Sequence, residues 1–207
     1  MMKNLAAKLG VVIVLVEIAA ISALLFLLRR PELPAGTGVI LVFLLPVTFG
    51  LHVWEEFVFP GKGADWFRAY HSEYGPAFKD SYFFKINAIP LVLALLVTLG
   101  TFDFAGGFSF WGIRAWLAFL CMQGFNVIFH IRGVIQLKTK QGAPGIVTAC
   151  LLYVPLVVTS FAYLLKTGSV DVISAIICLA VGSLLQPALD LIKKQSMRKE
   201  KSLQAPL

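Results

Sequence analysis

The stretch VILVFLLPVTFGLHVWEEF, residues 39–57, is almost pure hydrocarbon until it ends in one imidazole and two carboxylates. Its length and composition are typical of a helix that crosses a membrane. On a regular helix, which turns about 100° per residue, Glu55 lies about 60° to one side of His52 and Glu56 about 40° to the other. The three side chains can therefore converge on one point.

Two interpretations of this cluster compete. Ionisable groups near hydrocarbon are costly and usually face a bundle interior or a watery cavity, which indicates a functional site. The alternative is that the helix is already leaving the membrane at His52 and that both glutamates are solvated. We favour the functional interpretation because of the cost of placing charge beside hydrocarbon.

The composition is that of an integral membrane protein. Of the 207 residues, 58% are hydrophobic and 14% are charged, and the mean hydropathy is +0.84. These values lie outside the range of ordinary soluble domains. Six apolar runs of spanning length predict an all-α membrane helix bundle with helices at 5–28, 37–58, 84–102, 111–136, 146–165 and 169–192.

The predicted helices divide the chain into three parts. Residues 1–36 form an N-terminal signal-anchor helix and turn, because the first apolar run contains a single charge, Glu17, and is long enough to span. Residues 37–192 form the main membrane domain. Residues 193–207 form a basic cytoplasmic tail, which we predict to be disordered and suited to anionic lipid.

The basic residues indicate the orientation in the membrane. An even number of spans places both termini on one side. If that side is cytoplasmic, all but Arg29, Arg30, Arg114 and Lys166 of the 18 Lys and Arg residues lie inside. The positive-inside rule therefore predicts cytoplasmic termini. The same distribution accounts for the net charge of +7 without a nucleic-acid partner. The oligomeric state stays open.

Residues 62–85 are the longest polar interruption in the chain. Aromatic residues recur there at every fourth position, with basic residues between them. The aromatic residues are Trp66, Tyr70, Tyr74 and Phe78. The pattern predicts a short interfacial aromatic segment at the headgroups. The alternative is a lid over the His52 cluster, with His71 or Glu73 reaching inward.

A second histidine matches the first in depth. Asn126 and His130 are four residues apart and share one face of the fourth predicted helix. His130 lies about two turns from the cytoplasmic end of its helix, as His52 does in its own. Asn87 lies near the cytoplasmic end of the third predicted helix. A lone intramembrane histidine is usually a packing residue, but the matched depth favours a shared site.

Prolines mark two further features. Pro46 predicts a bend about one and a half turns before His52, which opens a pocket there or serves packing alone. Residues 141–145 turn the chain into the fifth predicted helix. The N-terminal amides of that helix attract a phosphate or developing oxyanion, or they form an ordinary helix start after Pro144.

These residues resemble a known family. His52-Val53-Trp54-Glu55-Glu56, the Asn126 and His130 pair, and the segment from Pro144-Gly145 to Thr148 resemble the bacterial HXXEE-domain proteins, over roughly residues 40–190. The family carries no firmly assigned activity. The resemblance implies a metal-binding membrane enzyme in a bacterial inner membrane. The chain also has a distant likeness to CAAX-type intramembrane proteases. It has Pro60 where those proteases have an arginine, four residues after Glu56, and this difference argues against peptide cleavage.

The chemistry predicted for the cluster is that of a catalytic metal site. We expect His52, Glu56 and His130 to bind one divalent metal, zinc first and iron or manganese next, with an open position for water. Glu55 is the expected general base, and the alternative is that the two glutamates exchange roles. Asn126 or Asn87 would orient a ligand or stabilise an oxyanion.

Three functions remain open at this point. The first is a metal-dependent membrane enzyme, most simply a hydrolase, acting on a lipid or other hydrophobic small molecule that enters from the cytoplasmic leaflet. The second is a small transporter or ligand-binding membrane protein that uses His and Glu as a proton or cation site. The third is a polar cluster that only ties the helices together, which is inefficient at about 0.6 kcal/mol per interhelical polar contact.

Overall fold

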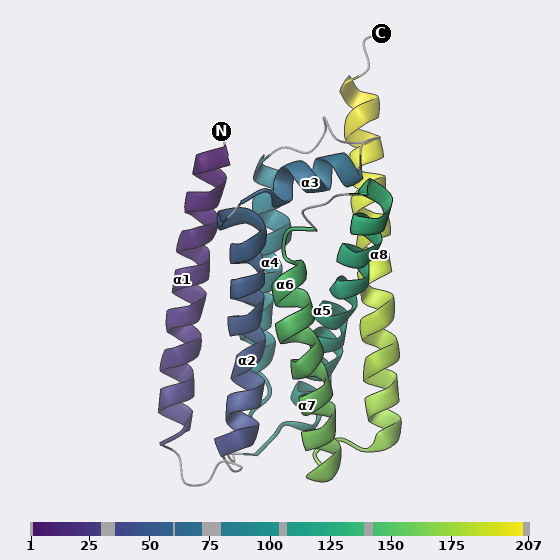
Figure 1. Cartoon of the computed structure of the whole chain (residues 1–207). Helices are drawn as coiled ribbons and strands as arrows, with labels where there is room; N and C mark the ends of the chain where they lie inside the picture. The colour runs from purple at the N-terminus through teal and green to yellow at the C-terminus, as the bar shows by residue number, and fades with distance from the viewer. Residues whose placement is uncertain are drawn as a thin grey trace.

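The bundle is all-α in the part of the chain that the structure describes. The computed structural model describes residues 2–29, 36–59, 61–71, 80–103, 107–138 and 143–204. Within these ranges no strand forms, and extended backbone pairs at one isolated bridge between Phe102 and Phe108. The long helices stand side by side as one bundle (Figure 1). The predicted all-α helix bundle is confirmed.

Six helical segments are long and apolar enough to cross a membrane. They are α1 (Met2–Leu27), α2 (Gly36–Val53) with a π-helical end (Trp54–Val58), α4 (Asp80–Leu99), α5 (Phe110–Leu137), the run of α6 (Ile146–Thr148), a π-helical turn (Ala149–Tyr153) and α7 (Val154–Lys166), and α8 (Val172–Gln204). The prediction of six helices of spanning length is therefore confirmed. The start of α1 and the end of α8 lie at the same end of the bundle (Figure 1).

Helix α8 is longer than the sequence predicted. It continues as helix to Gln204 instead of ending near residue 192. The prediction of a disordered basic tail was wrong for the backbone of residues 193–204. That segment contains good helix formers and neither Gly nor Pro, so nothing in it breaks a helix that has already begun.

A short helix, α3 (Gly63–Tyr70), lies across the end of the bundle where α1 begins and α8 ends (Figure 1). Its inner face buries Trp66. The Trp66 and Tyr70 rings stack with their centroids 5.4 Å apart. The predicted aromatic segment thus begins with these two residues, whereas Tyr74, Phe78 and Glu73 lie outside the described residues.

Pro46 lies inside α2 without ending it. A proline has no N–H, so it leaves the carbonyl four residues earlier without its helical donor. That carbonyl, of Val42, accepts the indole N–H of Trp116 at 3.1 Å and the hydroxyl of Thr98 at 3.4 Å. The donors come from α5 and α4, so the missing backbone bond of α2 is replaced by two interhelical bonds.

Candidate metal centre

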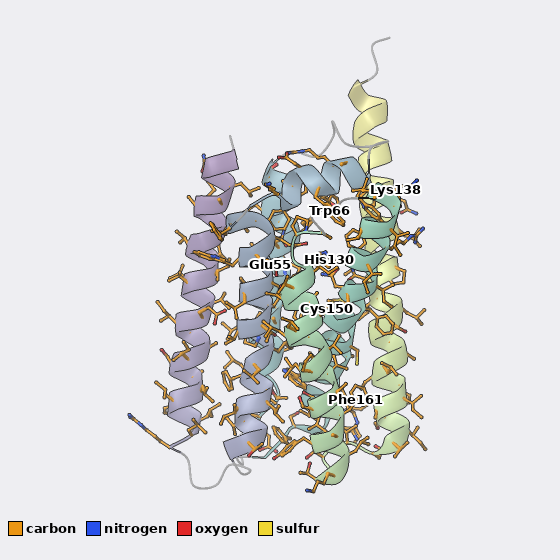
Figure 2. The ribbon with its side chains drawn as sticks, in the orientation of Figure 1. Glu55, Trp66, His130, Lys138, Cys150 and Phe161 are labelled. Carbon is orange, nitrogen blue, oxygen red and sulfur yellow. The ribbon has the colours of Figure 1, made fainter. Side chains whose placement is uncertain are left out.

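The two buried histidines come from different spans. His52 lies in the last turn of α2, Glu56 in the π-helical end that follows, and His130 in α5. Both imidazoles are buried. Figure 2 shows His130, Glu55 and Trp66 in the half of the bundle nearest α3. The matched depth that the sequence predicted for the histidines agrees with this position.

The three predicted ligands come together around Glu56. His52 Nε2 lies 3.8 Å from Glu56 Oε2, and His130 Nε2 lies 3.5 Å from Glu56 Oε1. One ligand atom from each residue lies within 4.8 Å of the other two. Tetrahedral zinc with bonds of about 2.0–2.1 Å requires donor atoms roughly 3.3 Å apart. Two imidazoles and a carboxylate at these separations fit a divalent transition metal after a small closure.

Asn126 lies between the two imidazoles. Its amide nitrogen is 3.0 Å from His52 Nε2 and 3.3 Å from His130 Nε2. The four-residue spacing from Asn126 to His130 places both on one face of α5, as the sequence predicted. Asn126 therefore contacts the same nitrogen atoms that would bind the metal.

Thr148 fixes the orientation of His52. Its hydroxyl lies 3.0 Å from His52 Nδ1 and donates to the carbonyl of Gly145 at 3.1 Å. Because the hydroxyl proton goes to Gly145, the threonine oxygen is left to accept Nδ1–H of His52. The Nε2 lone pair then points at the cluster. Metal-binding histidines are commonly oriented through their other ring nitrogen in this way.

Glu55 does not join the cluster. Its carboxylate accepts the backbone N–H of Thr148 at 2.8 Å and that of Val147 at 3.3 Å. These amides begin α6, so the helix start that was predicted to attract a phosphate or oxyanion is already occupied by Glu55. A carboxylate is the side chain that a helix N-terminus favours. The structure thus brings Glu56 to the histidines and Glu55 to α6.

A π-helical turn separates the two glutamates from the regular geometry of α2. The N–H of Phe59 bonds to the carbonyl of Trp54 at 2.9 Å, which is an i+5 pairing. A second π-helical turn, Ala149–Tyr153, follows Thr148 directly. Such turns are rare and occur often at functional sites. Here both adjoin residues of the cluster.

Asn87 lines a cavity that it shares with the cluster. This cavity has a volume of about 90 Å³, and His52, Glu56, Asn126 and Asn87 line it. The Asn87 amide donates to the carbonyl of Phe83 at 2.8 Å and is not bonded to either histidine. A water molecule occupies about 30 Å³ in the liquid, so the cavity holds a few waters and no lipid. Pro90 lines it as well, whereas Pro46 is not among its lining residues.

Trp66 covers the cluster from the side of α3. Its indole stacks on His130 with centroids 5.8 Å apart and planes 27° apart. The ring also lies against Gly133, where any Cβ would collide with it. Among the described residues, His130 Nδ1 and Trp66 Nε1 have no hydrogen-bond partner. Because the Asn126 amide nitrogen can only donate to His130 Nε2, the ring proton of His130 is on Nδ1, where no described residue orients it as Thr148 orients that of His52.

Sequence reasoning missed Thr148 and Trp66 as parts of this site. Thr148 was included in the Pro144-Gly145 segment, which was interpreted as a helix start, and Trp66 was interpreted as an interfacial anchor. Gly145 is a third such residue. It has φ +81°, and a Cβ there would lie 2.6 Å from Glu56 Cγ and 2.7 Å from His52 Cε1. The available signal was a glycine that follows two helix breakers, Gly142 and Pro144, and precedes Thr148.

Comparison with known proteins adds one finding. Residues 43–160, more than half of the chain, match the family model described as "Protein of unknown function with HXXEE motif". The chain belongs to the HXXEE family. The motif of this HXXEE protein is His52 to Glu56, and the match also contains Asn126, His130 and Thr148. No curated protein and no solved structure matches the chain.

Proposed function

We propose that this HXXEE protein is an integral-membrane, metal-dependent enzyme, most simply a hydrolase, that acts on a lipid or other hydrophobic substrate. The observation that carries the proposal is the buried group of His52, Glu56 and His130, whose ligand atoms lie within 4.8 Å of one another. Buried ionisable groups inside a membrane bundle are costly unless paired or used. Two imidazoles and one carboxylate match the donor set of catalytic zinc and non-haem iron sites.

Each residue around the cavity has a proposed role. A divalent metal held by His52, Glu56 and His130 supplies Lewis-acid activation of water or of a substrate oxygen. Thr148 holds the His52 ring so that Nε2 faces the cavity. Asn126 offers an amide N–H beside both imidazoles, where it orients a substrate oxygen.

The two glutamates take different roles in this proposal. Glu56 is the ligand, since both histidines face it. Glu55 was predicted as general base, and its bonds to Val147 and Thr148 support a positioning role instead. Through Thr148, Glu55 holds the residue that orients His52. Asn87 faces the cavity from α4 and contacts the substrate rather than the metal.

The side of entry follows from charge and depth. His130 of the cluster lies in the half of the bundle nearest α3, where α1 begins and α8 ends (Figure 2). The excess of Lys and Arg in the segments at this end favours the cytoplasmic side. We therefore propose a bacterial inner membrane, cytoplasmic termini and substrate entry from the cytoplasmic leaflet.

Metal content by mass spectrometry tests the proposal. Protein purified in detergent without a histidine tag is compared with the His52→Ala, His130→Ala and Glu56→Gln variants. The chain supplies matched controls: His71→Ala removes the third histidine, and Glu17→Gln removes a carboxylate inside another span. Neither His71 nor Glu17 belongs to the cluster.

The expected result is near-stoichiometric zinc, iron or manganese in wild type and in both controls, with loss in the three cluster variants. A metal-free wild type, after reconstitution with each of these ions, would rule out the metalloenzyme. If the wild type holds metal and the cluster variants lose it, the next step is to test lipid esters and phosphoesters as substrates.

A proton or cation site in a small transporter is the second candidate. One observation favours it: Glu17 lies inside α1, and Oε1 of its carboxylate is buried with no hydrogen-bond partner among the described residues. Glu17 faces Gly50, two residues before His52. Proton flux into liposomes that is lost in Glu17→Gln, from a protein without metal, would favour this candidate.

A further inference from the structure

Two more cavities lie along α5 beside the metal cavity, and they differ in chemistry. The first, of about 350 Å³, has polar side chains from α5, from α8 and from the residue that follows α3: Arg132, Gln136, Ser183, Gln186 and His71. The second, of about 210 Å³, is apolar and lies between α5, α7 and α8. We name them the polar cavity and the apolar groove.

The two cavities are neighbours along α5. Phe125 and Ile128 line both the polar cavity and the apolar groove. Cys121 and Gly124 line the groove, whereas Arg132 and Gln136 line the polar cavity. A helix rises about 1.5 Å per residue, so the lining runs roughly 20 Å along α5. Its polar end is nearest α3, and its apolar end is deeper in the bundle.

This order of polarity is that of a lipid in one leaflet. The polar end lies at the end of the bundle that carries α3, and the groove opens where Val158 is 61% exposed on α7. A charged guanidinium binds a phosphate through two parallel N–H bonds. An apolar groove beside such a site accommodates a hydrocarbon chain.

The polar cavity also adjoins the metal cavity. Phe129 and Gln186 line both, so one layer of side chains separates a bound headgroup from the cluster. The metal cavity of about 90 Å³ admits only the reacting part of a substrate. We place the remainder of the substrate in the neighbouring cavities.

We infer that an anionic phospholipid of the cytoplasmic leaflet binds here, with its phosphate on Arg132 and one chain in the apolar groove. The inference rests on the proposed function insofar as it names the substrate class of that enzyme. Arg132 sets the preference for a phosphate headgroup. Phe129 and Gln186 form the wall past which the headgroup reaches Glu56 and the histidines.

Lipid binding measured by native mass spectrometry tests the site. The probe is lysophosphatidylglycerol, which carries one chain and one phosphate, and inorganic phosphate is the competitor. Arg132→Gln removes the proposed phosphate partner, and Lys85→Gln removes an exposed cation elsewhere. Val158→Trp fills the groove, and Ile176→Trp places the same side chain on a lipid-facing position of α8 that is 60% exposed.

One lipid per chain is expected in wild type. We expect Arg132→Gln and Val158→Trp each to weaken the binding at least tenfold, while Lys85→Gln and Ile176→Trp leave it unchanged. Equal affinities in Arg132→Gln and Lys85→Gln would overturn the inference. So would inorganic phosphate that binds as tightly as the lipid, since the groove would then contribute nothing.

Metal content of the same samples separates the two proposals. If the wild type is free of metal but binds lipid through Arg132 and Val158, the metalloenzyme proposal is ruled out and the lipid site stands. If the protein holds metal and its lipid affinity is unchanged in both variants, the lipid site is ruled out and the metal centre stands. Arg132 and Val158 do not line the metal cavity, so their substitution leaves the metal content unchanged.

Discussion

Thr148 Oγ1 lies 3.0 Å from Nδ1 of His52, although 96 residues separate the two in the chain. The contact joins the HXXEE motif on α2 to the start of α6. Glu55, three residues after His52, binds the backbone N–H of the same threonine at 2.8 Å. Glu55 of the motif therefore binds the backbone of Thr148, and the side chain of Thr148 in turn orients His52.

Thr148→Val removes the hydroxyl that orients His52 and keeps the shape of the side chain. We expect metal affinity to fall about 10–100-fold, as for other partners of metal-binding histidines, with little change in the melting temperature. Competition with a chromophoric chelator measures the affinity. Thr148→Ser restores it, and Thr159→Val, which removes an exposed hydroxyl bonded within α7, leaves it unchanged.

Gly145→Ala adds one methyl group beside both Glu56 and His52. The variant combines a positive φ with a collision at 2.6 Å from Glu56 Cγ. Gly168→Ala is the matched control, because Gly168 has φ +68° and no heavy atom within 4 Å of the added Cβ. In both variants we expect the free energy of unfolding to fall by about 1–2 kcal/mol, because alanine must adopt a left-handed backbone conformation. Only Gly145→Ala is expected to lose metal as well, and equal metal content in the two would contradict the geometry.

The two glutamates are separable by substitution. Glu56→Gln removes a ligand charge, so we expect loss of metal. In Glu55→Gln one oxygen that accepts an amide N–H becomes an NH₂ group, which lowers stability by about 1–3 kcal/mol. Thermal unfolding and metal content distinguish them: Glu55→Gln lowers the melting temperature and retains metal. A stable, metal-loaded Glu55→Gln that is inactive would restore Glu55 as the general base.

The bond from Trp116 to Val42 exists because Pro46 has no N–H. Trp116→Phe leaves the Val42 carbonyl with the weaker Thr98 contact and is expected to cost about 1–3 kcal/mol. In a Pro46→Ala background the backbone supplies its own donor, so the same change costs less. A double-mutant cycle by thermal unfolding measures the difference, and additive effects would show that the two are independent. Trp111→Phe, at a residue 76% exposed, is the neutral control.

Hydropathy and spacing were sufficient for the bundle and for the convergence of His52, Glu56 and His130. Spanning length follows from apolar runs, and depth follows from counting residues to the helix ends. The different roles of the two glutamates were not predictable, because angles on a regular helix place Glu55 and Glu56 on either side of His52, both within its reach. A π-helical turn and the position of α6 decide which glutamate meets the histidines, and both depend on tertiary packing.

The aromatic spacing of residues 66–78 illustrates the same limit. Periodicity indicated an amphipathic segment, and α3 confirms that for Trp66 and Tyr70. It did not indicate that Trp66 would stack on His130, because the partner lies on another helix. Gly133, which makes room for the indole, carried no distinguishing pattern in α5.

The position of Trp66 over His130 has a kinetic consequence. The indole stacked on His130 covers the cluster on the side of α3, so we predict that an ion enters or leaves past that helix. We expect movement of α3 to limit the rate of exchange. A chelator in excess would remove the ion at a rate that does not rise with chelator concentration, and Trp66→Ala would accelerate that rate.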